Sequence, residues 1–513
     1  MLRCKMTLPR WSSLLRGACL LVLATGCSQN PEAQFAWRDS TLDLLPKARD
    51  GVQSAVNDAF GTPHNLVAWD KLPVDFGGVQ GVVQPPAEGE TLSATQFHVQ
   101  WDGSPAGIGA GSELLWMTGG LAKSKQPTAT VVKYDDATKT IELKTKGDAP
   151  AAGDRIAVGF GHQLQLGRAV YMKNCNHCHG VAGDGNGPTA QYLNPRPRDY
   201  RLGLFKFTST LSSEKASRED LERIITNGIP GTYMPSFLLL GNNDGGKEMT
   251  AVVEYVRWLA MRGEMEKRLV DELSGDYSQT SLDAEAVKSK KSYDEARIEY
   301  DKARKAGNKD VEKPEPAQSR SQLVKAAGEE LKKYLEEEFS GTINDTSEFI
   351  ADSWKRADDP ASRVVPTVAR VPDDAASRER GRLLYMSDKA KCYTCHGSKG
   401  RGNGPAVEDF WKKPGSNETY AKRGLHDTWG NPLPPRDLTR GQYRGGRRPM
   451  DVFSRVYAGI KGTPMPAFGG TVLKDSDIWD IVNFVMSLPF EEPVPSSKPA
   501  SAPHMAAAEA VSQ

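Results

Sequence analysis

Two short segments of the chain share the pattern C-x-x-C-H, at residues 175–179 and 392–396. Their cysteine and histidine side chains are Cys175, Cys178, His179, Cys392, Cys395 and His396. In this pattern two thiols can form thioether bonds to the vinyl groups of a haem, and the adjacent imidazole can bind its iron. The two copies therefore predict two covalently attached haem c groups and a redox function.

A methionine followed by proline lies downstream of each motif, as Met234 and Met465. The thioether of methionine is a neutral donor that raises the reduction potential of haem iron relative to a second histidine. The following proline disfavours helical backbone at the methionine, which would hold the sulfur on a rigid loop. We therefore predict Met234 and Met465 as the second axial ligands. Met172 and Met386, which precede the motifs on predicted helices, are expected to pack in the core.

Zinc is the main alternative for two C-x-x-C pairs, because four thiolates can form a tetrahedral site. Zinc ribbons, however, place the two pairs about 15–20 residues apart. Here more than 200 residues separate Cys178 from Cys392, and zinc does not explain a histidine directly after each pair. The spacing therefore favours haem.

The motifs lie within an internal repeat. The matched segments are 167–172 with 381–386, 180–188 with 397–405, 197–199 with 435–437, and 228–235 with 459–466. The repeat predicts two copies of one helical domain, at residues 163–262 and 376–490. Arg198 and Arg436 occupy the same repeat position, where a guanidinium could pair with a haem propionate or remain a solvated surface group. The second copy also contains a longer insert, which includes His426.

The arrangement resembles the class I c-type cytochromes. An N-terminal helix with Gly167 and Tyr171, the haem motif, the methionine–proline loop and a C-terminal helix with Tyr255 and Trp258 carry the resemblance. It covers the two repeated domains and implies a small helical fold in which the first and last helices cross near the haem. It also implies His/Met iron ligation.

The N-terminus predicts export. A basic start precedes a short apolar run at residues 17–25, which is typical of a secretory signal peptide over residues 1–26 and is too short to span a bilayer. The following Cys27 resembles the acylated cysteine of bacterial lipoproteins, although Ala24 stands where leucine is usual. We expect acylation of Cys27, with an ordinary cleaved signal as the alternative. The protein would then lie on the periplasmic face of a bacterial membrane.

The remaining regions predict a mainly α-helical chain of several domains. Residues 27–64 are expected to be a spacer, 65–162 a small β-rich accessory domain, 263–375 a charged helical linker and 491–513 a disordered tail. In the β-rich region, Phe97, Val99 and Trp101 alternate with polar residues as in a half-buried strand. The net charge of +1 over 513 residues gives no reason to expect a nucleic-acid partner.

These observations predict an exported dihaem c-type cytochrome that carries electrons between redox protein partners in a respiratory chain and is attached to a membrane surface by lipid. It would be an electron carrier rather than an enzyme, because six-coordinate His/Met iron leaves no open position for substrate. The alternative is a dihaem peroxidase-like enzyme, which needs one haem with a vacant distal position and nearby acid–base groups.

Overall fold

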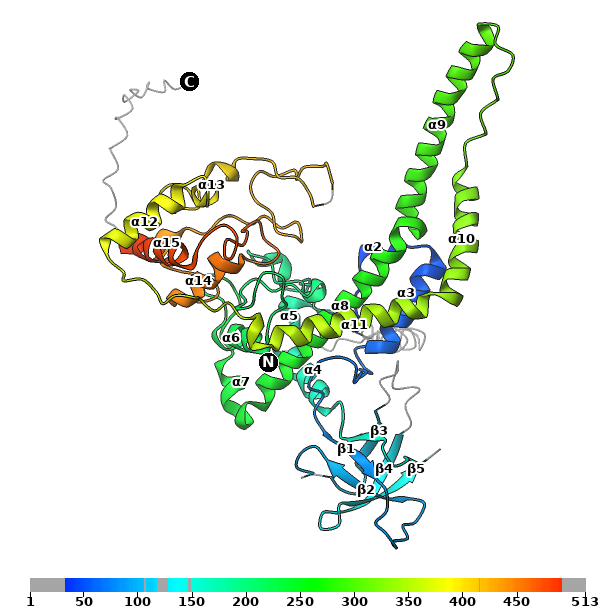
Figure 1. Ribbon diagram of the computed structural model, residues 1–513, viewed down its shortest axis with the longest axis vertical. Coiled ribbons are helices and arrows are strands. Elements are labelled where there is room, and N and C mark those ends of the chain that lie inside the picture. The colour runs from blue at the N-terminus through cyan, green and yellow to red at the C-terminus, as the bar shows by residue number, and fades with distance from the viewer. Residues whose placement is uncertain (1–32, 106–107, 118–127, 146–148, 415, 491–513) are drawn as a thin grey trace, which may run out of the picture.

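The computed structural model describes residues 33–105, 108–117, 128–145, 149–414 and 416–490. The predicted signal peptide, Cys27 and the predicted tail at residues 491–513 lie outside these ranges. From bottom to top in Figure 1, a β-barrel is followed by a central helical body, from which a helical hairpin and a second helical domain project. Within the described ranges, no helix combines the length and the apolar character needed to cross a membrane.

The β-rich region is a barrel of six antiparallel strands, closed in the order β1-β2-β5-β4-β3-β6. The strands are β1 (Val79–Gln84), β2 (Gln96–Trp101), β3 (Glu113–Trp116), β4 (Thr128–Asp135), β5 (Thr140–Thr145) and β6 (Arg155–Val158). Alternate residues such as Val83, Val99 and Ile141 fill the interior. The prediction of a β-rich region is confirmed, and closure of the barrel removes the exposed strand edges that an open sheet would have.

The segment before the barrel, expected to be a spacer, packs into the main core. It contains α2 (Asp39–Leu42) and α3 (Pro46–Phe60), whose Val52 and Phe60 are fully buried. Phe60 packs edge-on against Trp258, whose indole N–H donates a hydrogen bond of 3.2 Å to the carbonyl of Val67. The apolar face of α3 is therefore covered by a helix about 200 residues further along the chain.

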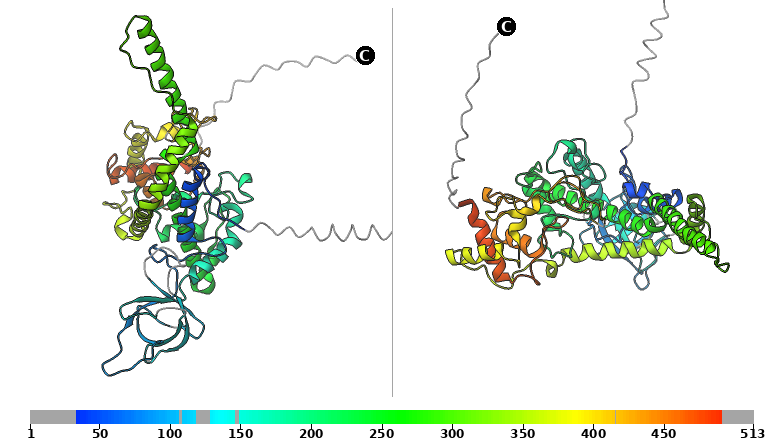
Figure 2. Two further views of the ribbon diagram at one scale, coloured as in Figure 1. Left: turned by 90° about the vertical axis from the view of Figure 1, so that its right-hand side faces the viewer. Right: turned by 90° about the horizontal axis from the view of Figure 1, so that it is seen from above.

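Two helical domains carry the haem motifs. The first contains α4 (His162–Asn174), α5 (Asn176–His179), α6 (Arg218–Asn227), α7 (Leu238–Asn242) and α8 (Lys247–Tyr277). The second contains α12 (Ala375–Met386), α13 (Cys392–His396), α14 (Pro449–Ala458) and α15 (Asp475–Ser487). In Figure 2 the second domain, in yellow to red, lies against the first.

The first and last helices of each domain cross at a glycine, as the resemblance implied. A Cβ atom at Gly167 of α4 would collide with the backbone oxygen of Ala251 in α8. Likewise, a Cβ atom at Gly381 of α12 would collide with the backbone oxygen of Asp480 in α15. Glycine is therefore required at both crossings because the two backbones touch.

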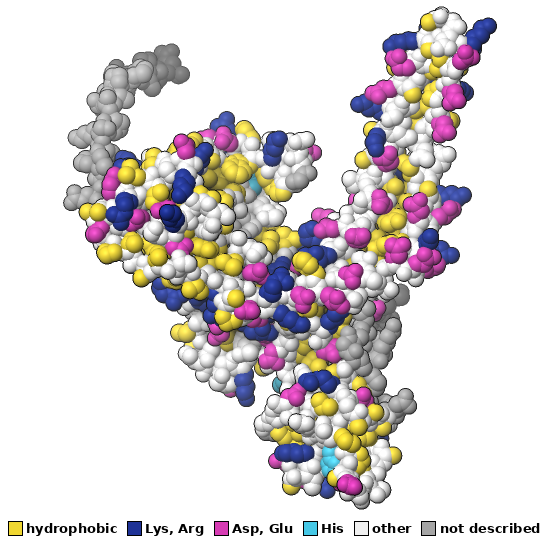
Figure 3. Space-filling view, in the orientation of Figure 1, with side chains coloured by type: hydrophobic (Ala, Val, Ile, Leu, Met, Phe, Trp, Pro, Cys, Tyr) yellow, Lys and Arg dark blue, Asp and Glu magenta, His cyan; other side chains and the backbone are white. Residues whose placement is uncertain are grey.

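The charged segment between the two domains is helical. Helix α8 runs through the boundary expected at residues 262–263, and a hairpin of α9 (Gln279–Lys305) and α10 (Arg320–Glu337) follows. Lysine, arginine and acidic side chains are scattered along the hairpin, as Figure 3 shows. Helix α11 (Phe339–Asp358) then returns to α8, where Ile350 and Trp354 are fully buried.

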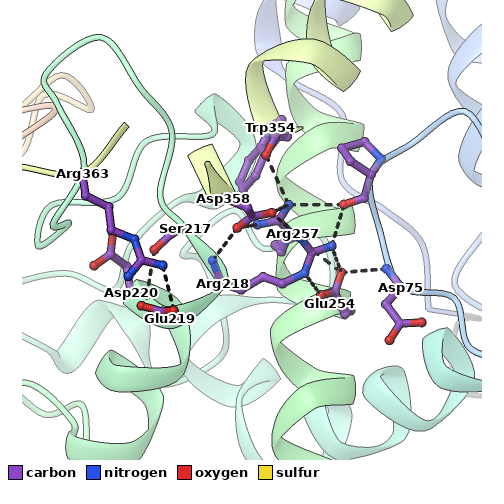
Figure 4. Close-up of polar contacts among 11 residues, drawn as sticks. Asp75, Ser217, Arg218, Glu219, Asp220, Glu254, Arg257, Trp354, Asp358 and Arg363 are labelled. Carbon is purple, nitrogen blue, oxygen red and sulfur yellow. Dashed lines mark hydrogen bonds and ion pairs between the residues drawn. The ribbon is translucent and has the colours of Figure 1, made fainter. Parts of the chain in front are cut away.

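A cluster of buried charges fastens α8 to its neighbours (Figure 4). Arg257 and Glu254 of α8 are almost wholly buried, and the Arg257 guanidinium lies 3.0 Å from the carboxylate of Asp358 in α11. Arg218 of α6 contacts both carboxylates, while Glu254 also accepts a 3.0 Å hydrogen bond from the backbone N–H of Asp75. Buried charges of both signs compensate each other, so four segments meet around one ionic network.

Candidate haem-binding sites

The first haem motif forms a short helix that the following glycine-rich loop holds in place. The backbone N–H of Gly185 donates to the carbonyl of His179 at 2.9 Å, and that of Gly187 donates to the carbonyl of Cys178 at 3.1 Å. A Cβ atom at Gly187 would collide with the carbonyl oxygen of His177, so the loop can approach the motif only with glycine there. The repeated glycines thus support the haem motif.

The second motif is held by the same contacts at the matched residues. The backbone N–H groups of Gly402 and Gly404 donate to the carbonyls of His396 and Cys395, at 2.8 and 3.0 Å. Tyr385 of α12 donates its hydroxyl proton to the carbonyl of Gly397 at 2.8 Å. In the first domain Tyr171 makes the same 2.8 Å bond to the carbonyl after its own motif. Both domains therefore present their cysteines and histidine on equivalent backbones.

Both motif histidines are oriented by a backbone carbonyl from the P-R-D segment. Nδ1 of His179 lies 3.1 Å from the carbonyl oxygen of Arg198, and Nδ1 of His396 lies 3.2 Å from that of Arg436. A carbonyl only accepts, so Nδ1 carries the proton and Nε2 keeps a free lone pair, as in iron- and zinc-bound histidines. Burial lowers the pKa of His179 to about 4 and also lowers that of His396, which keeps both rings neutral at pH 7.

None of the four motif cysteines forms a disulfide. Burial raises the pKa of Cys175 and of Cys392 to about 12, so these sulfurs are protonated at neutral pH. Cys392 packs against the core of the second domain, and the sulfur of Cys178 lies 3.3 Å from the hydroxyl of Thr189. Since no disulfide joins them, both pairs are available for thioether bonds.

The two methionine loops have the same hydrogen bonds. In the first domain the N–H of Met234 donates to the hydroxyl of Thr232 at 3.1 Å, and its carbonyl accepts from the N–H of Ile229 at 3.1 Å. In the second domain Met465 bonds Thr463 at 3.2 Å and Ile460 at 3.1 Å in the same way. Each loop begins at a glycine of positive φ that ends the preceding helix, Gly228 after α6 and Gly459 after α14. The loops are therefore fixed by their own local bonds.

One pocket of the first domain brings the predicted site residues together. Cys175, Cys178, His179 and Met234 all line it. Its other walls are mostly apolar and include Leu193, Phe205, Phe207, Leu221, Ile224, Ile225, Ile229, Val252 and Val256. Two thiols, a neutral imidazole and a thioether within an apolar pocket fit a haem. In the second domain Met465 and Cys392 both pack against one core, with partly exposed side chains. Met172 and Met386 pack against the cores of their domains, as expected.

The zinc alternative does not fit this arrangement. The two C-x-x-C pairs lie in separate domains. Among the residues that the structure describes, no three histidine, cysteine or acidic side chains come together in a way that could hold a metal ion. The thiols are therefore arranged for attachment of a cofactor rather than for a tetrathiolate site.

Two contacts near the sites were not expected from the sequence. Arg198, for which a haem propionate or solvent was predicted as partner, lines the pocket of the first domain, and its guanidinium lies 3.7 Å from the ring centre of Trp429, in the insert of the second domain. Burial lowers the pKa of Arg198 to about 10. The only sequence signal for this contact was the insert itself, which is absent from the first copy. His426, also in the insert, stacks on Tyr420 with ring centres 3.9 Å apart.

Comparison with protein families agrees with this geometry. The family model described as Cytochrome c matches residues 164–260 and 379–489. No curated protein sequence matches the chain. Among solved structures, a chain of the reducing HAO-like protein complex of Kuenenia stuttgartiensis is similar, with 24% identity and a TM-score of 0.37 over 63% of this chain and 96% of that chain. The two matched regions of this protein are cytochrome c domains, which bind covalently attached haem c and transfer electrons.

Proposed function

We propose that the protein is a dihaem electron carrier that accepts electrons from one redox protein and passes them to another. The observation that carries this proposal is the first-domain pocket, where both thiols of the haem motif, His179 and Met234 line the same apolar space. A bound haem c supplies exchange of single electrons at its iron. A His/Met pair leaves no iron position for a substrate, which favours electron transfer over catalysis.

The site residues have distinct proposed roles. Cys175 and Cys178 would form the thioether bonds to a haem c in the first domain, and Cys392 and Cys395 would form those in the second. His179 and Met234 would supply iron ligands in the first domain, and His396 and Met465 would supply them in the second.

The chain contributes orientation and a dry environment. The carbonyl of Arg198 fixes the ring of His179, which presents Nε2 to the pocket. Hydrogen bonds to Thr232 and Ile229 hold the Met234 loop without help from the cofactor. Because both ligands are held before and after an electron arrives, little atomic movement accompanies the change of charge. The apolar walls exclude water and thereby raise the reduction potential.

Axial-ligand substitution tests the proposal. Met465→His and Met234→His should each retain two haems per chain and lower the potential of the substituted site by about 0.1 V or more, since axial ligands shift haem potentials over about 0.8 V. A redox titration followed by the optical spectrum measures the potentials, and a pyridine haemochrome assay counts the haems. Met386→Leu, in the core before the second motif, is the matched control and should leave both potentials unchanged. A variant Met465→His with the wild-type potential would show that Met465 is not a ligand.

A peroxidase-like enzyme is the competing interpretation. Such an enzyme needs one site that can open, whereas both methionine loops keep the same hydrogen bonds. We therefore expect the reduced protein to turn over hydrogen peroxide no faster than free haem does. Rapid stoichiometric consumption of peroxide would refute the carrier function.

The proposed place of work is the periplasmic side of a bacterial membrane, within a respiratory chain. The signal-like sequence at residues 1–26 supports export, and the lipoprotein-like Cys27 supports a lipid anchor. Mass spectrometry of the mature protein should find a chain that starts at an acylated Cys27. A mature N-terminus elsewhere, without lipid, would show that the anchor is absent.

A further inference from the structure

The insert of the second domain, residues 406–434, reaches the first domain. The separation between the motif histidine and the P-R-D arginine is 19 residues in the first domain and 40 in the second. Lys206 of the first domain forms a 3.2 Å ion pair with Asp427 of the insert, and both side chains are largely buried. Asp427 also accepts the backbone N–H groups of Trp429 and Asn431, at 3.1 and 3.0 Å. One carboxylate thus shapes the insert and anchors it across the interface.

The Trp429 side chain contacts both domains. The guanidinium carbon of Arg198 is 3.7 Å from its ring centre. The ring also packs on Gly462 of the Met465 loop, where an added Cβ atom would be 2.6 Å from the indole. The N–H of the neighbouring Thr428 donates to the carbonyl of Gly462 at 3.1 Å. Trp429 therefore touches the first domain and the methionine loop of the second at once.

Arg198 continues this contact to the first site. Its carbonyl oxygen is the acceptor for Nδ1 of His179, at 3.1 Å. Its side chain is half-buried, burial lowers the pKa of the guanidinium to about 10, and partial desolvation strengthens a cation–π contact with an indole face. One residue thus holds the proposed iron ligand of the first domain with its backbone and the insert with its side chain.

A second contact joins an arginine of the second domain to the methionine loop of the first domain. Arg436, whose carbonyl accepts from His396, has its guanidinium next to Gly231 in the Met234 loop, where an added Cβ atom would be 2.7 Å away. Gln442 accepts from this guanidinium at 2.9 Å and holds it in place. Arg436 therefore touches the methionine loop of the first domain directly, whereas Arg198 reaches the methionine loop of the second domain through Trp429.

We propose that Trp429, stacked on Arg198, couples the two haem sites by holding the first-domain histidine and the second-domain methionine loop in one fixed arrangement. This inference rests on the proposed function, because it assumes that electrons pass between the sites. One electron leaves the reduced site and enters the oxidised one, so that the first is oxidised as the second is reduced. No bond is broken and no proton is needed. The role of Trp429 is positioning.

Substitution of Trp429 in the holoprotein tests the coupling. In a partly reduced sample, the rate of electron exchange between the two sites should fall about tenfold in Trp429→Ala. Loss of the cation–π contact lowers the equilibrium constant for the closed domain interface by about this factor. Trp429→Phe keeps an aromatic face and should stay within about threefold of the wild-type rate. Trp411→Ala is the matched control, since Trp411 lies in the same insert and donates to Ala406 within it.

Amide hydrogen exchange tests the same coupling without depending on electron transfer. Hydrogen exchange at residues 198–206 and 459–465 should accelerate together in Trp429→Ala and remain at wild-type levels in Trp411→Ala. If Trp429→Ala does not mature, Arg198→Met removes the same contact and leaves the carbonyl that His179 uses. The coupling is refuted if either variant, with two haems per chain, exchanges electrons as fast as wild type. Absence of His/Met ligation in wild type would instead refute the proposed function itself.

Discussion

In the first cytochrome c domain, the closing helix α8 is buried by segments outside the repeat, whereas side chains of α15 in the second domain hydrogen-bond to a short stretch before α12. Helices α3 and α11 pack around α8, and Trp258 donates to the carbonyl of Val67. In α15 the corresponding bonds run to residues 368–372, from Trp479 and Asn483. The haem-side contacts are the same in both domains, from the glycine crossing to the methionine loop.

This difference separates two kinds of sequence constraint. Residues that face the haem site are shared by the two copies, because the same attachment and ligation must be reproduced. Residues on the outer face of the closing helix differ, since each copy meets another part of the chain there. The matched positions Trp258 and Ser487, and Glu254 and Asn483, show this most clearly.

The largest expected effect is at the Trp258 position. Trp258 is fully buried against Phe35 and Phe60, so Trp258→Ala should lower the free energy of unfolding by about 3–5 kcal/mol. Ser487→Ala removes only a local bond to the carbonyl of Phe484 and should cost less than about 1 kcal/mol. Urea denaturation followed by circular dichroism measures both. Equal losses at the two positions would mean that the segments outside the repeat do not stabilise the first domain.

The chemistry-bearing residues could be predicted because they are local in sequence. Thioether attachment uses two cysteines and iron ligation uses the adjacent histidine, all within five residues, and the methionine loop has its own turn and proline. The structure brings Cys175, Cys178, His179 and Met234 to one pocket, while their roles as haem attachments and iron ligands remain predictions. The strands of the β-rich region were likewise visible from the period-two alternation of residues such as Phe97 and Val99.

The long-range packing could not be predicted in this way. Helix α3 was taken for a spacer because its apolar face is completed by α8, and no local pattern records that partner. Similarly, the guanidinium of Arg198 finds Trp429 more than 200 residues away, in another domain. A single sequence does not identify the partners of these side chains, because the partners come into contact only after the domains have packed.

A smaller loss of unfolding free energy is expected at the matched positions Glu254 and Asn483. The first domain has a buried carboxylate there, and the second domain has an amide. Glu254 lies between Arg218 and Arg257, so Glu254→Gln should destabilise the protein by about 3 kcal/mol, because two guanidinium groups then share Asp358 alone. Urea denaturation is the measurement. A loss below about 1 kcal/mol would show that Asp358 alone can balance both arginines.

Two variants calibrate this result. Asn483→Ala removes the amide that accepts from Arg370 and donates to Ser377, and it should cost about 1–2 kcal/mol. Glu272→Gln changes an exposed carboxylate on the same helix as Glu254 and should stay within about 0.5 kcal/mol of wild type. The expected order of the three losses is therefore Glu254, then Asn483, then Glu272.

The smallest expected effect concerns Lys461, whose matched residue in the first domain is the uncharged Pro230. Lys461 is in the Met465 loop, and its ammonium donates to the hydroxyl of Thr210 at 2.7 Å and to the carbonyl of Glu214. Burial lowers the pKa of Lys461 to about 8, against the raising influence of the Asp220 and Glu214 carboxylates, while Lys215 lowers it further.

The sign of the resulting pH dependence follows from the charge. Below pH 8 the ammonium is positive and favours an added electron at the second site, and above pH 8 that charge is lost. The potential of the second site should therefore fall as the pH rises from 7 to 9. The expected fall is a few tens of millivolts, because a nearby unit charge contributes on the order of 1 kcal/mol at an effective dielectric constant of 20. Redox titrations of the holoprotein at pH 6 to 10 measure it.

Lys461→Met separates this charge from other titrating groups. The variant keeps a long side chain without an ammonium, so its second site should have the high-pH potential of the wild type at every pH in the range. A variant that keeps the full pH dependence would place the titrating group elsewhere, and the two methionine loops would then be electrostatically equivalent despite their different sequences.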